Sequence, residues 1–492
     1  MAIKRYTANS DTTITNAFES NLTNRGTDAN MGASDILEIF SLYGQNGGTS
    51  SELERTLIKF PVDEIISDRA AEDIPAVGKV NFYLKMHNAP HSQTLPRNFT
   101  LSAKKVTTDW QEGIGLDMEE YKDKTYGNAG ATWVSASNTT TWTRMGGDYD
   151  ATEYKQTFAE GTEDLELDIT TLIEDWVLNG NNYGIGLQLT ASEEAYHSGA
   201  AGADDVDGEL NNLSGATLSY YTKKFFARSS EFFFKRPVIE ARWNSSIQDD
   251  RGDFYASSSM VPAADNLNTI YLYNISRGQY VDIPNYDTDL NLRIYATLGG
   301  STIGSSSIGR VSAGIYSASF ALDTTASTVY DVWYSGSAEE RVNFHTGTID
   351  VKTHAGSTSQ PNTEYYSNIT NLKPIYSTDE SPRLQLYVRP KDWSPTIYTV
   401  ASQDIETTPI EKAAYKVYRV VDDLEVIPYG TGSDNHTIMS YDEKGNHFNL
   451  DMSLLQSDYA YGIKVAFYNP STKSYVEQRQ AWKFRVEDLD SQ

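Results

Sequence analysis

The commonest pattern along this chain is an alternation of apolar and polar residues, which puts the apolar side chains on one face of a β-strand. In the first half of the chain, loops rich in Gly, Asn and Asp separate these runs. The pattern predicts strands at 11–15, 36–42, 56–62, 80–86, 99–106 and 237–243. Because few other periodicities occur, we expect an all-β protein.

One stretch, 165–190, changes its period twice. It starts with a strand alternation, continues with apolar residues three to four apart, and ends with a second alternation at Ile185, Leu187 and Leu189. Thr171 and Glu174 have the spacing of a capping box, and 179–180 is an Asn-Gly pair that suits a helix end. We expect a strand, a short helix and a strand. The helix would cover the open end of a β-sandwich, with Trp176 as its anchor.

The second half of the chain has shorter alternating runs joined by Gly/Ser turns, which is typical of immunoglobulin-like sandwiches. A polar linker at 354–363 separates two such blocks. The predicted domains are a β-sandwich at 1–245, an immunoglobulin-like sandwich at 262–353 and a fibronectin-like sandwich at 366–490. In the last domain, we expect the Tyr459 hydroxyl to bond to upstream backbone, as in a tyrosine corner.

Composition narrows the range of partners. The 492 residues suffice for roughly three domains, and 67 acids against 40 bases give a formal charge of −27. This charge repels phosphate backbones and anionic membranes, so we expect no nucleic-acid or membrane partner. The segment 223–236 mixes bases with Phe, which suggests either a single-strand-binding groove or, as we favour, a buried β seam.

The chain has no cysteine, which excludes disulfides and thiolate metal sites. Its N-terminus lacks the apolar core of a secretion signal, and no run of about 20 apolar residues suggests a membrane span. We therefore expect synthesis in the cytoplasm. The composition of the chain, however, is typical of β proteins that lie outside the cell or on the surface of a particle.

The sequence contains few residue patterns that point to catalysis or metal binding. The sequence has no G-x-S-x-G, P-loop or H-E-x-x-H motif. His87 and His91 stand four apart, but Pro90 argues against the helix that would align them. The carboxylates at 204–209 lack full calcium-loop spacing, and the Arg-Gly-Asp at 251–253 is interpreted as a chance match. We expect no enzyme activity, no cofactor and no metal.

A long segment between Trp110 and Tyr154 is aromatic and Gly-rich with little periodicity. Loops of this length are commonly functional or packed as a cover. Trp133, Trp142 and Tyr149 are therefore candidate ligand-binding residues, since a sugar ring packs well on an aromatic face. The alternative, which we favour, is that these rings plug the rim of the sandwich. Trp110, together with Trp176 and Tyr459, is expected to be a structural anchor.

The first half of the chain resembles the DNRLRE-type β-sandwich domain, a jelly-roll-like module. The likeness covers six elements in order: 11–14; Arg55-Thr-Leu-Ile-Lys-Phe-Pro61; Val106-Thr-Thr-Asp-Trp-Gln-Glu-Gly113; Trp133, Trp142 and Gly146-Gly-Asp148; 165–190; and Arg236-Pro-Val-Ile-Glu240. Pro61 departs from the Asp found in many members. The resemblance implies a jelly-roll-like sandwich in the first half.

The whole chain also resembles structural proteins of marine tailed phages, especially at 228–243 and 266–273. This resemblance implies a location in the virion, which a protein made without a signal reaches by assembly. The expected function is a non-enzymatic component of capsid, neck or tail that contacts other virion proteins and further copies of itself. The alternative is a glycan-binding adhesin that contacts a host-surface glycan through the first domain. A polysaccharide-degrading enzyme is the least favoured interpretation.

Overall fold

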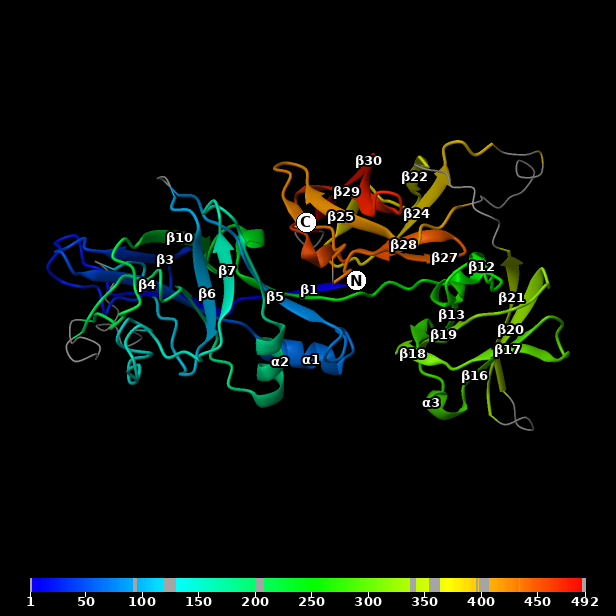
Figure 1. Ribbon diagram of the computed structural model, residues 1–492, viewed down its shortest axis with the longest axis horizontal. Coiled ribbons are helices and arrows are strands. Elements are labelled where there is room, and N and C mark those ends of the chain that lie inside the picture. Colours follow the sequence, from blue (N-terminus) through cyan, green and yellow to red (C-terminus); the bar gives the residue numbers. More distant parts are fainter. Residues whose placement is uncertain are drawn as a thin grey trace. The chain divides into compact units, whose positions relative to one another are not determined.

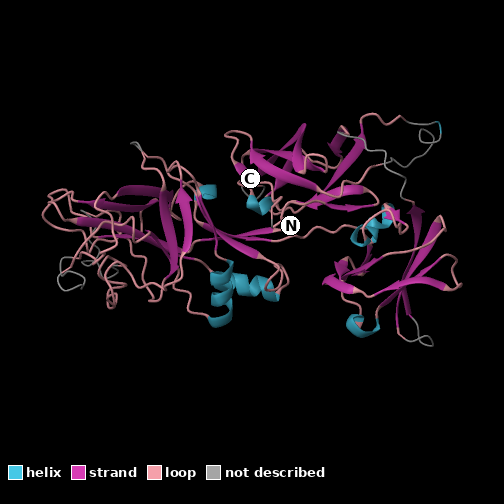
Figure 2. Cartoon of the chain, in the orientation of Figure 1, coloured by secondary structure: helices cyan, strands magenta, loops and turns pink. Residues whose placement is uncertain are grey.

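The computed structural model describes residues 2–91, 95–118, 130–199, 208–336, 342–353, 363–394, 397, 407–432 and 434–488. Two compact units account for the chain, one at Ala2–Trp243 and one at Asn244–Gln492. Strands dominate both units, and helices are few and short (Figure 2). The expected all-β class is therefore confirmed, and the predicted first domain boundary at 245 lies two residues from the division between the units.

The first unit is a β-sandwich of two antiparallel sheets (Figure 1). The smaller sheet has the order β1-β11-β5-β8, with strands at Ile3–Thr7, Val238–Arg242, Asn81–Met86 and Leu165–Asp168. The larger has the order β10-β3-β4-β9-β6-β7, with strands at Tyr220–Phe226, Ile36–Tyr43, Ser51–Lys59, Ile185–Leu189, Phe99–Lys105 and Tyr154–Phe158. A seventh strand, β2 (Ser10–Thr15), pairs with β4.

The inner core of this sandwich lies between the two sheets and follows from the alternation in the sequence. On β9, Ile185, Leu187 and Leu189 are fully or almost fully buried and join the core that includes Phe82 and Leu84 of β5. The intervening residues of β9 therefore point to the opposite, outer face of the larger sheet. Removal of this apolar surface from water stabilises the unit by roughly 25 cal/mol per Å².

Two helices connect the sheets at one end of the sandwich (Figure 1). α1 (Val62–Ala70) follows β4, and α2 (Thr170–Asn179) follows β8. Both chain segments cross from one sheet to the other, and Arg69 of α1 binds Glu174 of α2 through two contacts of 2.7 Å. The expected covering helix is therefore present, anchored by buried Trp176. The sequence analysis missed α1, its partner.

The start of α2 differs from the predicted capping box. The helix begins at Thr170, and no side chain of its N-cap residue, Ile169, accepts a bond. Instead, Asp168 Oδ1 accepts from Thr170 N at 3.0 Å, and Thr170 Oγ1 accepts from Phe82 N at 2.9 Å. The helix ends at Asn179, as predicted, with Gly180 at a φ of 70°.

A second, outer core covers the far face of the larger sheet. Its base is formed by Ile14 of β2 and by Leu53 and Leu57 of β4. Residues of the two long segments that follow β6 and β9 cover this base. The buried members are Ile14, Leu53, Leu57, Val106, Trp110, Ala131, Trp133, Ala136, Trp142, Ala195 and Leu210. Strand β4 is consequently buried on both faces.

The second sandwich packs a five-stranded sheet on a three-stranded sheet. The first has the order β12-β21-β20-β16-β17, at Phe254–Tyr255, Val342–Lys352, Thr328–Ser335, Asn291–Tyr295 and Thr302–Ser306. The second has the order β13-β19-β18, at Asn268–Tyr273, Ile315–Phe320 and Gly309–Ser312. Because β12 contributes Phe254 to the shared core, this domain begins before the predicted 262. A short hairpin, β14 (Ile275–Ser276) and β15 (Gln279–Tyr280), and the helix α3 (Tyr286–Asp289) complete the block.

The third sandwich has sheets in the orders β22-β24-β28-β27 and β23-β30-β29-β25-β26. In the first sheet, the strands lie in that order at Tyr365–Ile369, Arg383–Pro390, Gly445–Asn449 and Ser440–Asp442. In the second sheet, they lie at Ile375–Ser377, Ser474–Glu487, Ala460–Asn469, Ala413–Arg419 and Glu425–Ile427. Tyr415 and Phe448 stack between the sheets with ring centroids 4.1 Å apart. The predicted linker at 354–363 falls outside the described residues except for Thr363.

The tyrosine corner of the third sandwich uses a different tyrosine from the one predicted. Tyr461 is fully buried and its hydroxyl donates to Gln456 O at 2.8 Å. Tyr459 is only half-buried and packs its ring on Arg419, at 4.7 Å. Asp458, with a φ of 68°, directly precedes Tyr459. The prediction of Tyr459 as the anchor is therefore wrong, and Tyr461 has that role.

Replacing Trp176 should destabilise the first sandwich, because the ring fills the contact between α2 and the inner core. We expect Trp176→Ala to lower the free energy of unfolding of the fragment 1–245 by about 3–5 kcal/mol in urea denaturation. Leu178 on the same helix is 82% exposed, so Leu178→Ala is the matched control and should leave unfolding unchanged. Equal unfolding curves for all three proteins would contradict the anchor role of Trp176.

Tyr461 and Tyr459 provide a second matched pair. Tyr461→Phe removes one hydrogen bond and leaves Gln456 O without its donor, so the third sandwich should lose about 1 kcal/mol of stability in thermal or urea unfolding. Tyr459→Phe removes a hydroxyl outside the corner and should have no measurable effect. A larger loss from Tyr459→Phe than from Tyr461→Phe would restore the original assignment.

Candidate functional site

The two predicted ligand-binding tryptophans lie in the outer core and not on a surface. Trp133 is 0% exposed and Trp142 6% exposed. Their indole N–H groups donate to Gly208 O at 2.7 Å and to Thr132 O at 2.8 Å. An exposed sugar platform made from these rings is therefore ruled out, and the rim-plug interpretation agrees with the burial. Trp110, as expected, is a buried anchor, donating to Tyr183 O at 2.7 Å.

Tyr149, the third candidate, is half-buried against the outer face of strand β9. A Cβ added to Gly186 would meet the Tyr149 ring at 2.1 Å, so this strand position has room only for glycine. Gly147 has a φ of 103°, and a Cβ there would lie 2.4 Å from the Tyr149 hydroxyl oxygen. These two glycines allow the ring to lie flat between the long loop and the sheet. Burial raises the pKa of Tyr149 to about 12.

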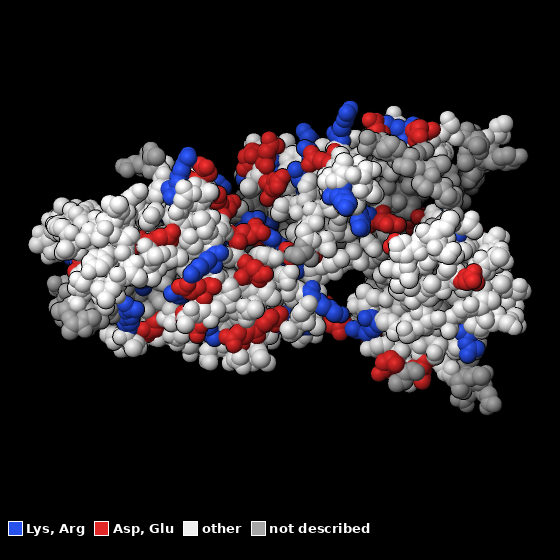
Figure 3. Space-filling model, in the orientation of Figure 1, with Lys and Arg blue, Asp and Glu red and all other residues white. Residues whose placement is uncertain are grey.

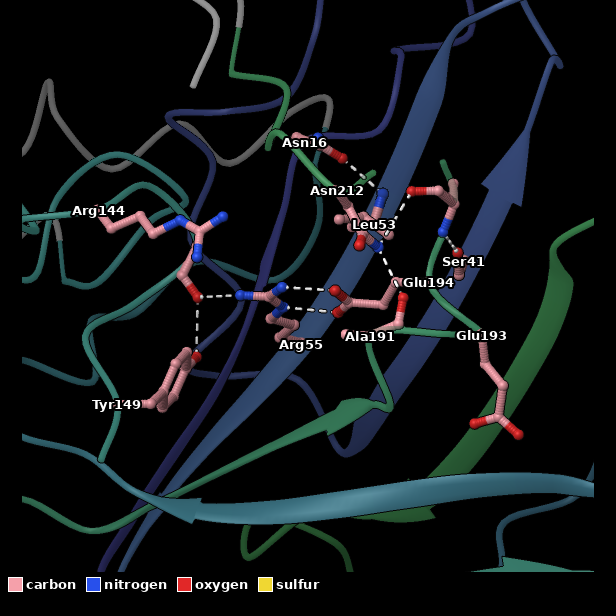
Figure 4. A network of polar contacts seen from close by, with 12 residues as sticks. Asn16, Ser41, Leu53, Arg55, Arg144, Tyr149, Ala191, Glu193, Glu194 and Asn212 are labelled. Carbon is pink, nitrogen blue, oxygen red and sulfur yellow. Dashed lines mark hydrogen bonds and ion pairs between the residues drawn. The ribbon is translucent and has the colours of Figure 1, made fainter. Parts of the chain in front are cut away.

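Arg55 is the central side chain beneath this layer (Figure 4). It points from β4 to the outer face and binds Glu194 through Nε and Nη2 at 2.9 and 2.8 Å. Its Nη1 donates to Gly146 O at 3.1 Å, the same carbonyl that accepts from the Tyr149 hydroxyl at 2.8 Å. Burial alone would lower the pKa of the Arg55 guanidinium, but Glu194 raises it above its ordinary value. One guanidinium thus joins β4, the 146–149 turn and the segment after β9.

Asp148 fixes the turn on the other side of this layer. Its carboxylate accepts from Thr143 N and Arg144 N, both at 3.0 Å, and from Thr108 Oγ1 at 2.8 Å. Burial opposes ionisation, yet these three bonds hold the pKa of Asp148 below its usual value. The Gly-Gly-Asp motif is therefore a structural turn whose acid accepts three hydrogen bonds from the neighbouring chain.

A cavity of about 590 Å³ opens between the turn, the outer face of the sheet and residues 191–194 and 210–212. Its lining combines charged, amide, hydroxyl and a few apolar groups: Arg55, Lys104, Thr107, Thr108, Thr143, Arg144, Gly147, Asp148, Tyr149, Asp150, Ala151, Gln188, Ala191, Glu194, Leu210, Asn211 and Asn212. Of the three predicted ligand-binding residues, only Tyr149 lines it. This volume falls within the range of small-molecule sites.

Sequence reasoning missed the cavity because its walls come from five stretches far apart in the sequence, at 55, 104–108, 143–151, 188–194 and 210–212. No sequence pattern marked it. Gln188 occupies an outward position of β9, between core-facing Leu187 and Leu189, and its side chain is 7% exposed. The Asn212 amide closes the wall by donating to Ala191 O at 2.8 Å (Figure 4).

The remaining motifs considered in the sequence are the histidine pair, the possible calcium loop and the Arg-Gly-Asp tripeptide. His87 Nδ1 lies 2.9 Å from Asp164, and within the described residues no group of three or more His, Asp or Glu side chains is placed to hold a metal ion. Of the possible calcium loop, 204–207 fall outside the described residues. Arg251 is bound to Asp331 by two contacts of 2.7 and 2.8 Å, which occupies the guanidinium of the Arg-Gly-Asp tripeptide.

The basic and aromatic segment 223–236 is partly internal, as favoured from the sequence. Lys223 is fully buried and donates to Asn88 Oδ1, Gly161 O and Glu163 O at 2.7–2.9 Å. Burial lowers its pKa to about 8. On the face shown in Figure 3, basic and acidic side chains are interspersed. Across the described part of the chain, no helix has the length and apolarity needed to cross a bilayer.

Comparisons with known proteins give only remote likenesses. No family model and no curated protein matches the chain. Among solved structures, a titin substructure is similar at 10% identity and a TM-score of 0.16, covering 49% of this chain and 95% of that one. A marsupial T cell receptor is similar at 12% identity and 0.16, covering 45% and 68%. Tandem immunoglobulin repeats of Dlar are similar at 9% and 0.14, covering 45% and 90%. Such TM-scores carry no argument, so the architecture rests on the strand pairing described above.

The buried pair of Arg55 and Glu194 should be essential to the outer core. Glu194→Gln leaves the guanidinium in place without its counter-charge, so we expect the fragment 1–245 to lose roughly 3 kcal/mol in urea denaturation. The control is Glu160→Gln, which breaks the exposed 2.9 Å pair with Arg97 and should leave stability unchanged. If both variants unfold like the parent protein, Arg55 is not the organising residue.

Proposed function

We propose that this chain is a non-enzymatic structural protein of a tailed-phage virion, belonging to the capsid surface, neck or tail. The observation that carries the proposal is the combination of three β-sandwiches in one cysteine-free chain with the sequence resemblance at 228–243 and 266–273. A chain of rigid modules can dock one domain on a particle and expose the others. Its partners would be other virion proteins and further copies of itself.

Each of the two resembling stretches contains a strand that contributes to a sandwich core. The first contains β11, whose Glu240 is fully buried between Arg5, at 2.8 Å, and Arg242, at 2.6 Å. Burial opposes ionisation of Glu240, but the neighbouring cations hold the pKa of this carboxyl well below its usual range. The second contains β13 of the second sandwich. A likeness at such positions supports a shared fold more directly than a shared partner.

The absence of cysteine is also consistent with assembly from a reducing cytoplasm. In the first unit, a second apolar core and buried ion pairs stabilise the long loops that disulfides hold in many secreted domains. Multiple copies on a symmetric particle would add weak single contacts through effective concentration, which is how such a protein would contribute to surface attachment.

Mass spectrometry of purified virions tests this function. For the phage that encodes the chain, we expect peptides from all three sandwiches in gradient-purified particles, at an abundance relative to the major capsid protein that stays constant through repeated purification. A non-structural replication protein of the same phage is the control and should be depleted. Absence of this chain from the particles would refute the proposal.

A further inference from the structure

Lys223 occupies a core-facing position of β10, where the alternation along the strand favours an apolar residue. The residues two positions away, Tyr221 and Phe225, both contact the inner core. Lys223 is 0% exposed, and its amine lies 4.7 Å from the ring centroid of Phe158 and 5.1 Å from that of Phe225. This burial lowers the pKa of Lys223 to about 8. The uncharged, nucleophilic form of the amine is therefore accessible near neutral pH.

The side-chain amide of Asn88 lies directly against this amine. Lys223 Nζ is 2.7 Å from Asn88 Oδ1, and its other two bonds go to the carbonyl oxygens of Gly161 and Glu163, at 2.9 and 2.7 Å. Because a C=O bond is about 1.2 Å long, Nζ lies within about 3.9 Å of the Asn88 Cγ carbon. A nucleophile poised for attack lies roughly 3–3.5 Å from its target. In the uncharged amine, two protons remain for the two backbone carbonyls, and the lone pair is left for Asn88.

A carboxylate and a backbone bridge hold Asn88 in this position. Asp164 Oδ1 accepts from Asn88 N at 2.7 Å, and Asp164 Oδ2 lies 2.9 Å from His87 Nδ1. Asn88 also forms an antiparallel bridge with Phe225, beside the lysine. Burial opposes ionisation of Asp164, but the bonds from His87 and from Asn88 N hold the pKa of Asp164 below its usual value. An ionised base therefore adjoins the asparagine.

We propose that Lys223 and Asn88 form an intramolecular isopeptide bond. The uncharged amine attacks Asn88 Cγ, so that the Nζ–Cγ bond forms and the Cγ–Nδ2 bond breaks. The attacking nitrogen loses one proton and the leaving Nδ2 group gains one, with Asp164 as the carrier between them. The products are an amide cross-link and one molecule of ammonia. The reaction needs no oxidant and no further reactant.

The cross-link joins the two sheets of the first sandwich. Asn88 follows β5 of the smaller sheet, and Lys223 belongs to β10 of the larger one. The two residues are 135 positions apart, so the bond closes a long loop and restricts the unfolded chain strongly. In a chain without cysteine, this bond has the role that a disulfide has in many secreted sandwiches. The inference goes beyond the proposed virion location and does not depend on it.

Mass spectrometry of the purified full chain tests the bond. We expect an intact mass that is lower than the sequence mass by one ammonia molecule and, after proteolysis, a branched peptide that contains both Asn88 and Lys223. Succinimide formation at an Asn-Gly pair such as 179–180 also releases ammonia, so the branched peptide is the deciding observation. Recovery of Asn88 and Lys223 only in separate, unlinked peptides from folded protein would overturn the proposal.

A matched pair of lysine variants assigns the nucleophile. Lys223→Met keeps a long side chain in the apolar surroundings and removes the amine, so the branched peptide should disappear. Lys224, the adjacent residue, has its amine 3.0 Å from Glu38, and Lys224→Met should leave the branched peptide unchanged. Circular dichroism confirms that each variant is folded. A branched peptide that persists in Lys223→Met, or one that is lost from folded Lys224→Met, would overturn the assignment.

Asp164→Asn tests the proton carrier. The variant keeps an acceptor for Asn88 N but removes the base, so the branched peptide should accumulate about tenfold more slowly. Since the cross-link does not reverse, the readout is the fraction of cross-linked chain at early times after expression begins. Equal accumulation in the parent chain and in Asp164→Asn would overturn the part of the proposal that makes Asp164 the carrier.

Discussion

The ion pair between Arg55 and Glu194 is the interaction on which the outer layer of the first sandwich depends. A guanidinium removed from water costs several kcal/mol unless its charge and its donors are all matched. Glu194 supplies the charge and two acceptors, and Gly146 O supplies a third. Since these partners belong to two long segments after different strands, correct folding of both segments is a condition for burying Arg55. The pair therefore couples loops that have little secondary structure to the rigid sheet below them.

Because Arg55 fixes the two long segments to the larger sheet, the segments pack on its outer face and form a second core there. The inner core follows from alternation along each strand, while the outer core adds a third layer of aromatic side chains. The indole N–H groups of Trp110, Trp133 and Trp142 each donate to a backbone carbonyl, so the rings also satisfy loop groups that water would otherwise bind. The cavity lies at the edge of this layer, where rigid walls hold polar groups in place.

Much of the fold was predictable from local pattern. The period changes at 165–190 correctly predicted a strand, a helix and a strand, because burial of one face dictates that spacing. Helix α1 was missed although Pro61 precedes it, Asp63 and Glu64 occupy its first turn and Arg69 its last, which are known helix-boundary signals. A strand interpretation continuing to residue 62 concealed them. Tyr459 was chosen in place of Tyr461 because the two stand two residues apart in the same pattern, and only the hydrogen bond from Tyr461 to Gln456 O distinguishes them.

The candidate site was less predictable, for a physical reason. Trp133 and Trp142 have the composition of a sugar platform, but a ring that fills a core and a ring that binds a sugar have the same local sequence. Only the three-dimensional arrangement distinguishes them. Gln188 shows the reverse case. It occupies an outward position in β9, where the third layer buries it beside a cavity built from distant segments.

Amide hydrogen exchange of the native chain tests the central claim, that the long loop is a folded layer fixed to the sheet through Arg55. The amides of Ala131, Trp142 and Gly146 donate to backbone carbonyls within the outer core. The account predicts that they exchange as slowly as amides of β4. Exchange at the rate of an ordinary surface loop, with β4 protected, would contradict it.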